Sequence, residues 1–458
     1  MRPLEFEKIK DKLDSLLHAN KKAELRGALI MLNEVDIAEY LESLDNERML
    51  VVFRLLPKDI STDVFAYMDN DQRTRIMEAL GDAETMRIID EMFIDDAVDF
   101  LEELPAGVVK RMLINCDEKR RELLNQFLRY PENSAGSIMT IEYAELHAGM
   151  TVAQAMNTIR RTAPDRETIN TLYVLDDRRE LLGTLALRKL LLAEEDRFVD
   201  DMMDTHVISV RTTDDQEQVA DCVRKYDLLS IPVVDHENRL VGIITVDDIM
   251  DVIEEENTED FEKMAAMLPS DEEYLKTSVL KMAKNRLPWL MMLMFSATLT
   301  GNIITHFENV LSSAETIGVA LVSCIPMLMD TGGNCGSQVS TLAIRGLALG
   351  QIEFRDIWRV LWKEVRVATI VGLALGVANY LRILYLTPYT QGVAMVVSLA
   401  IFFTVLLSKA IGCTLPLLAR AIHLDPALMA SPIITTVVDA ASLLVLFSIA
   451  TQVFHIAV

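Results

Sequence analysis

The sequence is poor in cysteine, and the cysteines that it has are scattered. Five occur among 458 residues, and no two of them stand in a C-x-x-C spacing. An odd, dispersed set favours reduced, mostly buried thiols over a disulfide framework or a zinc site. The sequence also contains no G-x-x-x-x-G-K-[ST] loop, so we expect no ATP hydrolysis of the P-loop kind.

Positive charge is scarce in the front part of the chain. Residues 1–270 contain 58 acids against 32 Lys and Arg, whereas residues 271–458 contain 11 acids and 12 Lys and Arg. The acidic part would repel phosphates, so we expect no nucleic-acid partner. It suits a solvated domain or one that collects cations. The N-terminus lacks the apolar core of a signal peptide, so we expect the front part to lie in the cytoplasm.

Residues 1–130 are predicted to form an acidic, superhelical α-helical N domain. Apolar residues recur there at three- and four-residue spacing, and Asp36–Leu44 resembles Asp96–Leu104. Repeated short helices that bury their apolar faces only by stacking indicate a small solenoid. The acids of the second copy are typical of a solvated helix face. The alternative is that some of them hold a divalent ion against another domain.

The next part of the chain contains a second, clearer repeat. Leu172–Leu190 aligns without gaps on Ile231–Ile249, and each copy has the pattern strand, Asp-rich turn, strand, helix. This pattern resembles a tandem of cystathionine-β-synthase-type (CBS) domains, which we place at 137–199 and 200–254. The resemblance implies an α/β regulatory pair. In many such pairs the cleft binds adenine nucleotides, which is an option here.

The helix that closes the second copy is crowded with carboxylates. Asp247, Asp251 and Glu254 or Glu255 lie at i, i+4 and i+7 or i+8, which is one helix face. Like charges at this spacing destabilise a helix unless cations or solvent compensate them. Hard oxygen ligands of this kind suit Mg²⁺ or Ca²⁺. A cation sensor and a solvated face are the two interpretations, and we assign residues 255–284 to a connecting helix and linker.

Residues 285–458 contain apolar segments near the length of about 20 residues that crosses a bilayer. The second segment is long, and we expect it to be interrupted at Pro326 and Gly332-Gly333. Lys and Arg gather before the first segment and between alternate ones, which predicts a cytoplasmic N-terminus and an external C-terminus in a plasma or inner membrane. The approximate limits of the five segments are Leu287–His306, Ile317–Leu349, Val365–Leu386, Gly392–Leu418 and Leu428–Val453.

Two acids stand inside these apolar segments. Asp439 lies in the last one, with Thr435 and Ser431 one and two turns before it on the same face, and Asp330 lies in the second with Asn334 nearby. A carboxylate in a bilayer is costly unless it faces water, protein or an ion. Asp439 therefore either pairs with a cation such as Lys409 or Arg420, or binds a transported cation. Two copies facing each other across a dimer axis would suit a divalent ion.

The order of these parts and the membrane motifs resemble the MgtE family of magnesium channels and transporters. The motifs are Pro326-Met-Leu-Met-Asp-Thr-Gly-Gly-Asn334 and Asp425-Pro-Ala-Leu with Thr435-Thr-Val-Val-Asp439. The resemblance implies a homodimer in the lipid bilayer with a central pore, in which Asp439 is the main ligand and Thr435 and Asn334 lie close by. It also implies a cytosolic Mg²⁺ sensor that includes Asp96, Asp99, Asp248, Asp251, Glu255, Glu259 and Asp260.

We therefore expect a multidomain membrane protein with a helical N domain, a CBS tandem, a connecting helix and five membrane helices. It would import Mg²⁺ down its electrochemical gradient and close when Mg²⁺ binds the acidic domains, with Ser431 and Asp330 added to the pore ligands. The alternative is a nucleotide-regulated transporter of another divalent cation or solute. We expect no enzyme, because the histidines of the spans, His306 and His455, lie at their edges.

Overall fold

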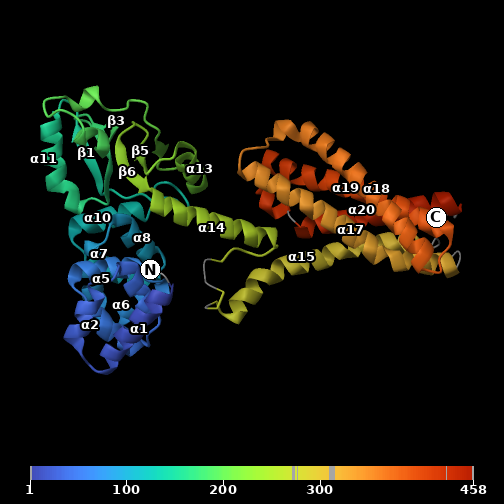
Figure 1. The fold of residues 1–458 in the computed structure, drawn as a ribbon, viewed down its shortest axis with the longest axis horizontal. Coiled ribbons are helices and arrows are strands. Elements are labelled where there is room, and N and C mark those ends of the chain that lie inside the picture. Colours follow the sequence, from blue (N-terminus) through green and yellow to red (C-terminus); the bar gives the residue numbers. More distant parts are fainter. Residues whose placement is uncertain (1–2, 271–273, 276, 309–314, 430, 456–458) are drawn as a thin grey trace. The chain divides into compact units, whose positions relative to one another are not determined.

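The computed structural model describes residues 3–270, 274–275, 277–308, 315–429 and 431–455. The chain forms two compact units, Met1–Ile253 and Glu254–Val458 (Figure 1).

The N domain is a stack of short helices, as predicted. Several begin at a side chain that accepts a backbone N–H: Asn33 accepts from Val35, and Asp45 from Arg48. The apolar faces of these helices form one continuous core. The helices are α1 (Pro3–His18), α2 (Lys22–Leu29), α3 (Glu34–Glu42), α4 (Asn46–Phe53), α5 (Lys58–Ala66), α6 (Asn70–Leu80), α7 (Asp82–Glu91), α8 (Ile94–Glu102), α9 (Ala106–Ile114) and α10 (Glu118–Phe127).

The two CBS repeats fold into two sheets of the same topology, with strand orders β1-β2-β3 and β4-β5-β6. In each sheet the first pair of strands is parallel and the second antiparallel. The elements are β1 (Tyr143–His147), α11 (Val152–Thr162), β2 (Thr168–Leu175), β3 (Leu181–Ala186), α12 (Leu187–Leu191), β4 (Val210–Arg211), α13 (Gln216–Tyr226), β5 (Ser230–Val234), β6 (Leu240–Thr245) and α14 (Val246–Met264), with short 3-10 turns at Ala163–Asp165 and Val199–Asp201.

The repeated glycines of these sheets allow a close approach of the backbone. A Cβ on Gly183 would lie 3.0 Å from the carbonyl oxygen of Asp204, and one on Gly242 would lie 2.8 Å from that of Thr140. The recurrence of glycine at one position of both copies therefore reflects the same packing. The hydroxyls of Tyr173 and Ser230, 2.7 Å apart, join the two copies in the buried core.

The second unit contains five helices that are long and apolar enough to cross a membrane, which confirms the predicted number among the described residues. Helices α17 to α20 run beside one another (Figure 1), and α15 packs against α20. Short 3-10 turns occur at Phe354–Asp356 (η3) and Pro426–Met429 (η4). The long helices are α15 (Val279–His306), α17 (Glu315–Ala348), α18 (Ile357–Leu386), α19 (Gln391–Ala421) and α20 (Ser431–Phe454).

The predicted interruption of the second span is wrong, because α17 is one α-helix through Pro326 and Gly332-Gly333. The glycines serve helix packing instead. A Cβ on Gly332 would lie 2.8 Å from the Thr404 methyl carbon of α19, and one on Gly336 would lie 2.7 Å from Ile434 Cγ2 of α20. In an apolar span no water is present to replace the backbone hydrogen bonds of the helix, so the backbone stays helical. Small residues then let neighbouring helices approach closely.

Candidate metal sites

Three carboxylates from distant parts of the sequence meet in the first unit. One ligand oxygen from each of Asp95, Glu167 and Asp248 lies within 4.8 Å of the others. Asp95 is in the first turn of α8, Glu167 directly precedes β2, and Asp248 is in the first turn of α14. The N domain, the first CBS repeat and the acidic helix therefore each supply one member of this cluster, which we call the junction cluster.

Local contacts fix the members of the junction cluster. The apolar face of α8 faces the core and places Asp95 at the start of the helix, where its carboxylate accepts the Asp96 N–H at 2.9 Å. Asp248 accepts from the backbone N–H of Thr245 at 3.2 Å and from its hydroxyl. Glu167 is held by the pairing of β1 with β2, since its N–H donates to the Glu142 carbonyl at 2.9 Å.

Burial and mutual repulsion shift the acidities of these groups. Burial first, and then the charges of Glu167, Asp96 and Asp248, raise the pKa of Asp95 well above its usual range. Burial and the neighbouring Asp248 raise the pKa of Glu167 to about 8. Burial also raises the pKa of Asp248 to about 6, although the Thr245 hydroxyl opposes the shift. Such a group of acids is stable only when it holds protons or a cation.

One oxygen of the junction cluster has no partner. Glu167 Oε2 is buried and makes no hydrogen bond within the described structure. Buried acceptors without a partner are rare, and a bound ion is one of the standard reasons for them. Three carboxylates at this separation are also the hard oxygen donors that Mg²⁺ takes. The residues present therefore fit a divalent cation.

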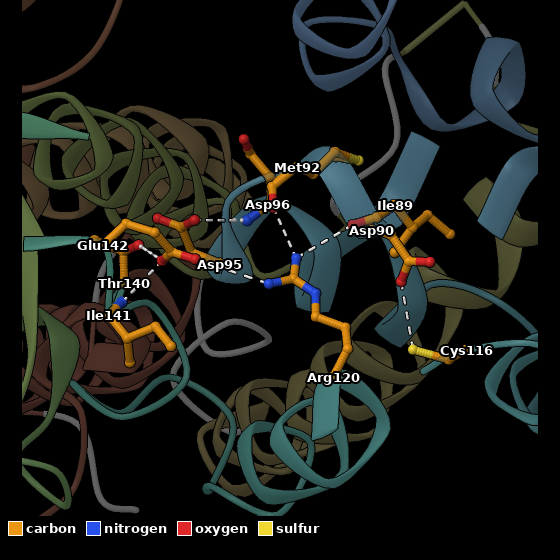
Figure 2. A network of polar contacts seen from close by, with 10 residues as sticks. All are labelled: Ile89, Asp90, Met92, Asp95, Asp96, Cys116, Arg120, Thr140, Ile141 and Glu142. Atoms are coloured by element: carbon orange, nitrogen blue, oxygen red, sulfur yellow. Dashed lines mark hydrogen bonds and ion pairs between the residues drawn. The ribbon is translucent and has the colours of Figure 1, made fainter. Parts of the chain in front are cut away.

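Two arginines lie near acids that neighbour the junction cluster, Arg120 near Glu142 and Arg73 near Asp96 and Asp99. Arg120 of α10 donates to the carbonyls of Ile89 (3.2 Å) and Met92 (2.7 Å), and its guanidinium lies 3.8 Å from Glu142, as Figure 2 shows. Arg73 of α6 donates to the carbonyl of Phe65 at 3.0 Å. Both guanidinium groups are thus fixed by backbone carbonyls, so their charges act from defined positions.

The structure brings together some of the predicted sensor residues and separates others. Asp248 belongs to the junction cluster. Asp96 and Asp99 lie on α8 beside it, and their charges act on each other and on Asp248. Asp251 and Glu255 are exposed further along α14. Among the described residues, Asp95, Glu167 and Asp248 form the only group of three or more His, Cys, Asp or Glu residues whose ligand atoms lie this close together.

Sequence reasoning missed two members of the junction cluster as ligands. Asp95 stood in the acidic segment of α8, but nothing separated it from Asp96 and Asp99. Glu167 is an acid in a turn before a strand, where no periodic pattern marks it. Its place next to Asp248 follows from the parallel pairing of β1 with β2 together with the bridge from Thr140 to Ile243 of β6, which no local signal in the sequence encodes.

The far end of α14 carries the last predicted sensor acids. Lys263 Nζ lies 2.7 Å from Glu259 and 2.8 Å from Asp425, which begins the turn before α20. Asp425 also accepts the Ala427 N–H at 2.8 Å and so shapes η4. Burial and then the charge of Asp425 raise the pKa of Asp260 to about 6. The end of α14 is thus held by charges against the start of the last span.

The predicted pore residues lie on two neighbouring helices. Asn334 Nδ2 donates to Asp330 Oδ1 at 3.1 Å along α17, and both side chains are exposed. Gly333 packs on Thr435 of α20, since a Cβ there would lie 2.9 Å from the Thr435 methyl carbon. This contact places the Asn334 turn of α17 beside the turn that precedes Asp439.

Asp439 itself has no counter-ion within the described part of the chain. Of the two cations that the sequence offered, Lys409 pairs with Glu364 of α18 at 3.6 Å. Asp439 is partly exposed and makes neither a hydrogen bond nor an ion pair with any described residue. The hydroxyl of Thr435 donates to the Pro432 carbonyl at 2.9 Å. The side chain of Ser431 lies outside the described residues.

Comparisons with known proteins cover most of the chain. A family model described as divalent cation transporter (MgtE) matches residues 325–449, and that of the MgtE intracellular N domain matches 32–133. The CBS domain model matches 135–196 and 199–255. The magnesium transporter MgtE of Thermus thermophilus is 35% identical over 97% of this chain and 98% of its own length. That of Bacillus subtilis is 32% identical over 96% of both chains.

Two solved structures resemble the front part. The soluble part of a magnesium transporter is 31% identical, with a TM-score of 0.53, and covers 55% of this chain and 99% of its own. The cytosolic domain of the Mg²⁺ channel MgtE in complex with ATP is 36% identical, with a TM-score of 0.50, and covers 53% of this chain and 99% of its own.

Proposed function

The chain belongs to the MgtE family of magnesium transporters and carries Mg²⁺ across a membrane, and from this premise we propose that it is a channel that imports Mg²⁺ and closes when Mg²⁺ binds its acidic domains. It is a multi-pass membrane protein and not an enzyme. In this proposal the N-terminus is cytoplasmic and the C-terminus external, because Lys and Arg flank the spans on one side.

The pore part of the proposal places Mg²⁺ at Asp439. A carboxylate that has no partner among the described residues and lies in an apolar helix is the group that a passing cation would neutralise. In a homodimer two copies of Asp439 would face one axis, with Thr435, Asn334, Asp330 and Ser431 lining the approach. Mg²⁺ loses its water shell reluctantly. This small number of donors therefore favours capture of the hydrated ion through its waters.

The direction of flow follows from the membrane potential. An inside-negative potential contributes about 2.3 kcal/mol per charge for each 100 mV, hence about 4.6 kcal/mol for a divalent ion. This suffices for uptake without ATP hydrolysis. A nucleotide in the CBS cleft, as in the ATP complex of the similar cytosolic domain, would then act as a regulator.

The junction cluster is the observation that carries the gating proposal. Its three acids come from three parts of the unit and lie within 4.8 Å of one another. When Mg²⁺ is scarce and the acids are ionised, they repel and the N domain separates from the CBS pair. When Mg²⁺ is abundant, it bridges the three acids and the unit closes. The negative charges of Asp96 and Asp99 add to the attraction for the ion.

The rest of the proposed sensor acts through α14, which is one helix from Val246 to Met264. Asp251 and Glu255 would bind further ions along it. Glu259 and Asp260 lie at its end beside Asp425 and the turn before α20. A change in the tilt of α14 would therefore reach the helix that carries Asp439.

Flux into liposomes tests both parts of the proposal. For the pore, Asp439→Ala should reduce Mg²⁺ uptake at least 100-fold, while the matched control Glu353→Ala, an exposed acid before α18, should leave it unchanged. For the gate, Asp95→Asn with Glu167→Gln should leave uptake intact at low Mg²⁺ on the cytosolic side and abolish its inhibition at high Mg²⁺. Wild-type flux through Asp439→Ala would refute the pore. Inhibition that persists in the double variant would refute the gate.

Parallel uptake of Co²⁺, Mn²⁺ and Ni²⁺ by the wild type tests the alternative of another divalent substrate.

A further inference from the structure

An ion pair joins two membrane spans at a place that the proposed pore does not use. Lys409 Nζ of α19 lies 3.6 Å from Glu364 Oε2 of α18, and the two side chains are only 8% and 16% exposed. Within the described structure Glu364 is the only partner of the Lys409 ammonium. The pair therefore places a full positive charge and one compensating negative charge inside the membrane domain.

Stability alone does not account for this pair. The loss of hydration of two buried charges roughly offsets their attraction, and apolar replacements of similar size are often neutral or stabilising. Ionisable groups within spans are functional candidates by default. The hydroxyl of Ser408, the residue before the lysine, does not share the charge, because its Oγ is buried without a hydrogen-bond partner among the described residues.

The helix that carries the lysine, α19, packs against the proposed pore helix α17. A Cβ on Gly412, three residues after Lys409, would run into the backbone of Gly336. The Lys409 charge is also close enough to act on Cys335 of α17. Cys335 directly follows Asn334, whose side chain points to the exposed side of the helix with Asp330. The positive charge is thus separated from the cation path by one helix.

We propose that Glu364 is a positioning residue for conduction, which cancels the positive charge of Lys409 behind α17 so that Mg²⁺ can occupy the path beside Asn334 and Asp439. The proposal rests on the pore assigned above. Without Glu364 the ammonium faces the doubly charged ion through protein and lipid, where little water screens the repulsion. With Glu364 in place the pair is a dipole, whose field falls off much faster with distance.

Charge-selective substitutions separate this role from a structural one. Glu364→Gln combined with Lys409→Arg keeps an uncompensated cation, because arginine does not lose its proton. We expect this variant to reduce Mg²⁺ uptake into liposomes at least tenfold. Lys409→Met should retain the wild-type rate or exceed it, and Glu364→Gln with Lys409→Met should lie within about twofold of wild type. A pair that only holds the helices together would instead make Lys409→Met as defective as the first variant, which would overturn the proposal.

Two further measurements keep the outcome interpretable. If the variant with the uncompensated cation does not fold, gel filtration in detergent will reveal it. In that case Lys409→Met and the swap Glu364→Lys/Lys409→Glu are measured instead. The proposal expects both to conduct Mg²⁺, and a tenfold loss of uptake in Lys409→Met overturns it. Asp439→Ala is measured alongside. Full flux in Asp439→Ala refutes the pore itself, whereas loss in Asp439→Ala with no loss from the uncompensated cation refutes only the role of Glu364.

Discussion

Raising the pH in the absence of Mg²⁺ should destabilise the first compact unit, because the junction cluster then loses its protons. The pKa of Glu167 is raised in the folded unit to about 8 from an ordinary 4.5. The folded state therefore binds more protons than the unfolded one between these values. Stability is then highest at acid pH and falls as the pH rises toward 8.

The size of the effect follows from the shift. At about 1.4 kcal/mol per pKa unit the ceiling for Glu167 is about 5 kcal/mol, and its partial exposure reduces this to about 2 kcal/mol. For a unit of this size about 2 kcal/mol corresponds to a change in Tm of about 4–8 °C. Mg²⁺ at about 100 times its Kd would restore about 2.7 kcal/mol at pH 8. It would restore little at pH 5, where protons occupy the acids.

The assay is thermal unfolding of a fragment with residues 1–264, from pH 5 to pH 8.5, with EDTA or with Mg²⁺. Glu167→Gln should flatten the pH dependence and reduce the response to Mg²⁺. Asp165→Asn, a nearby exposed acid outside the cluster, should change neither. A Tm in EDTA that stays constant over this range, or an equal gain from Mg²⁺ at pH 5 and pH 8, would refute the reasoning.

Three substitutions test the remaining contacts. Lys263→Met removes the cation between the end of α14 and the turn before α20, so closure should need severalfold more Mg²⁺, measured as the half-inhibitory concentration of flux. Gly336→Ala puts a methyl 2.7 Å from a side chain of α20 and should lower the Tm in detergent, whereas Gly301→Ala, with open space around it, should not. Tyr173→Phe loses a buried hydrogen bond and should cost the soluble fragment about 1 kcal/mol, measured by urea denaturation with the exposed Tyr226→Phe as control.

The sequence predicted the elements whose signals are local. Five long apolar runs and two copies of one strand–turn–strand–helix pattern can be read from hydropathy and spacing, and the structure contains both. It predicted a break at Gly332-Gly333 that does not exist, because a glycine in a span fits both a kink and a close helix contact. Only the neighbours, here Thr404 and Thr435, distinguish the two.

The candidate sites also separate into residues that local sequence signals mark and residues that only the fold brings together. Asp439 could be proposed as a candidate because an acid in an apolar run is visible in the sequence alone, and its role stays a prediction. Glu167 could not, because it joins Asp95 and Asp248 only through strand pairing and the stacking of α8. The partner of Lys409 was also hidden, since the sequence offered Asp439 and the fold supplied Glu364.

Because α17 is helical along its whole length, a tilt of the helix at one end displaces its other end. Its 34 residues correspond to a rod of about 50 Å at about 1.5 Å per residue, well above the hydrocarbon thickness of about 30 Å. A rod of that length has to tilt or protrude. A rotation of about 5° about one end would sweep the other end through about 4 Å, which is comparable to the radius of a small ion with its water. A tilt of the whole span would therefore change the width of a passage beside it without a break in the helix.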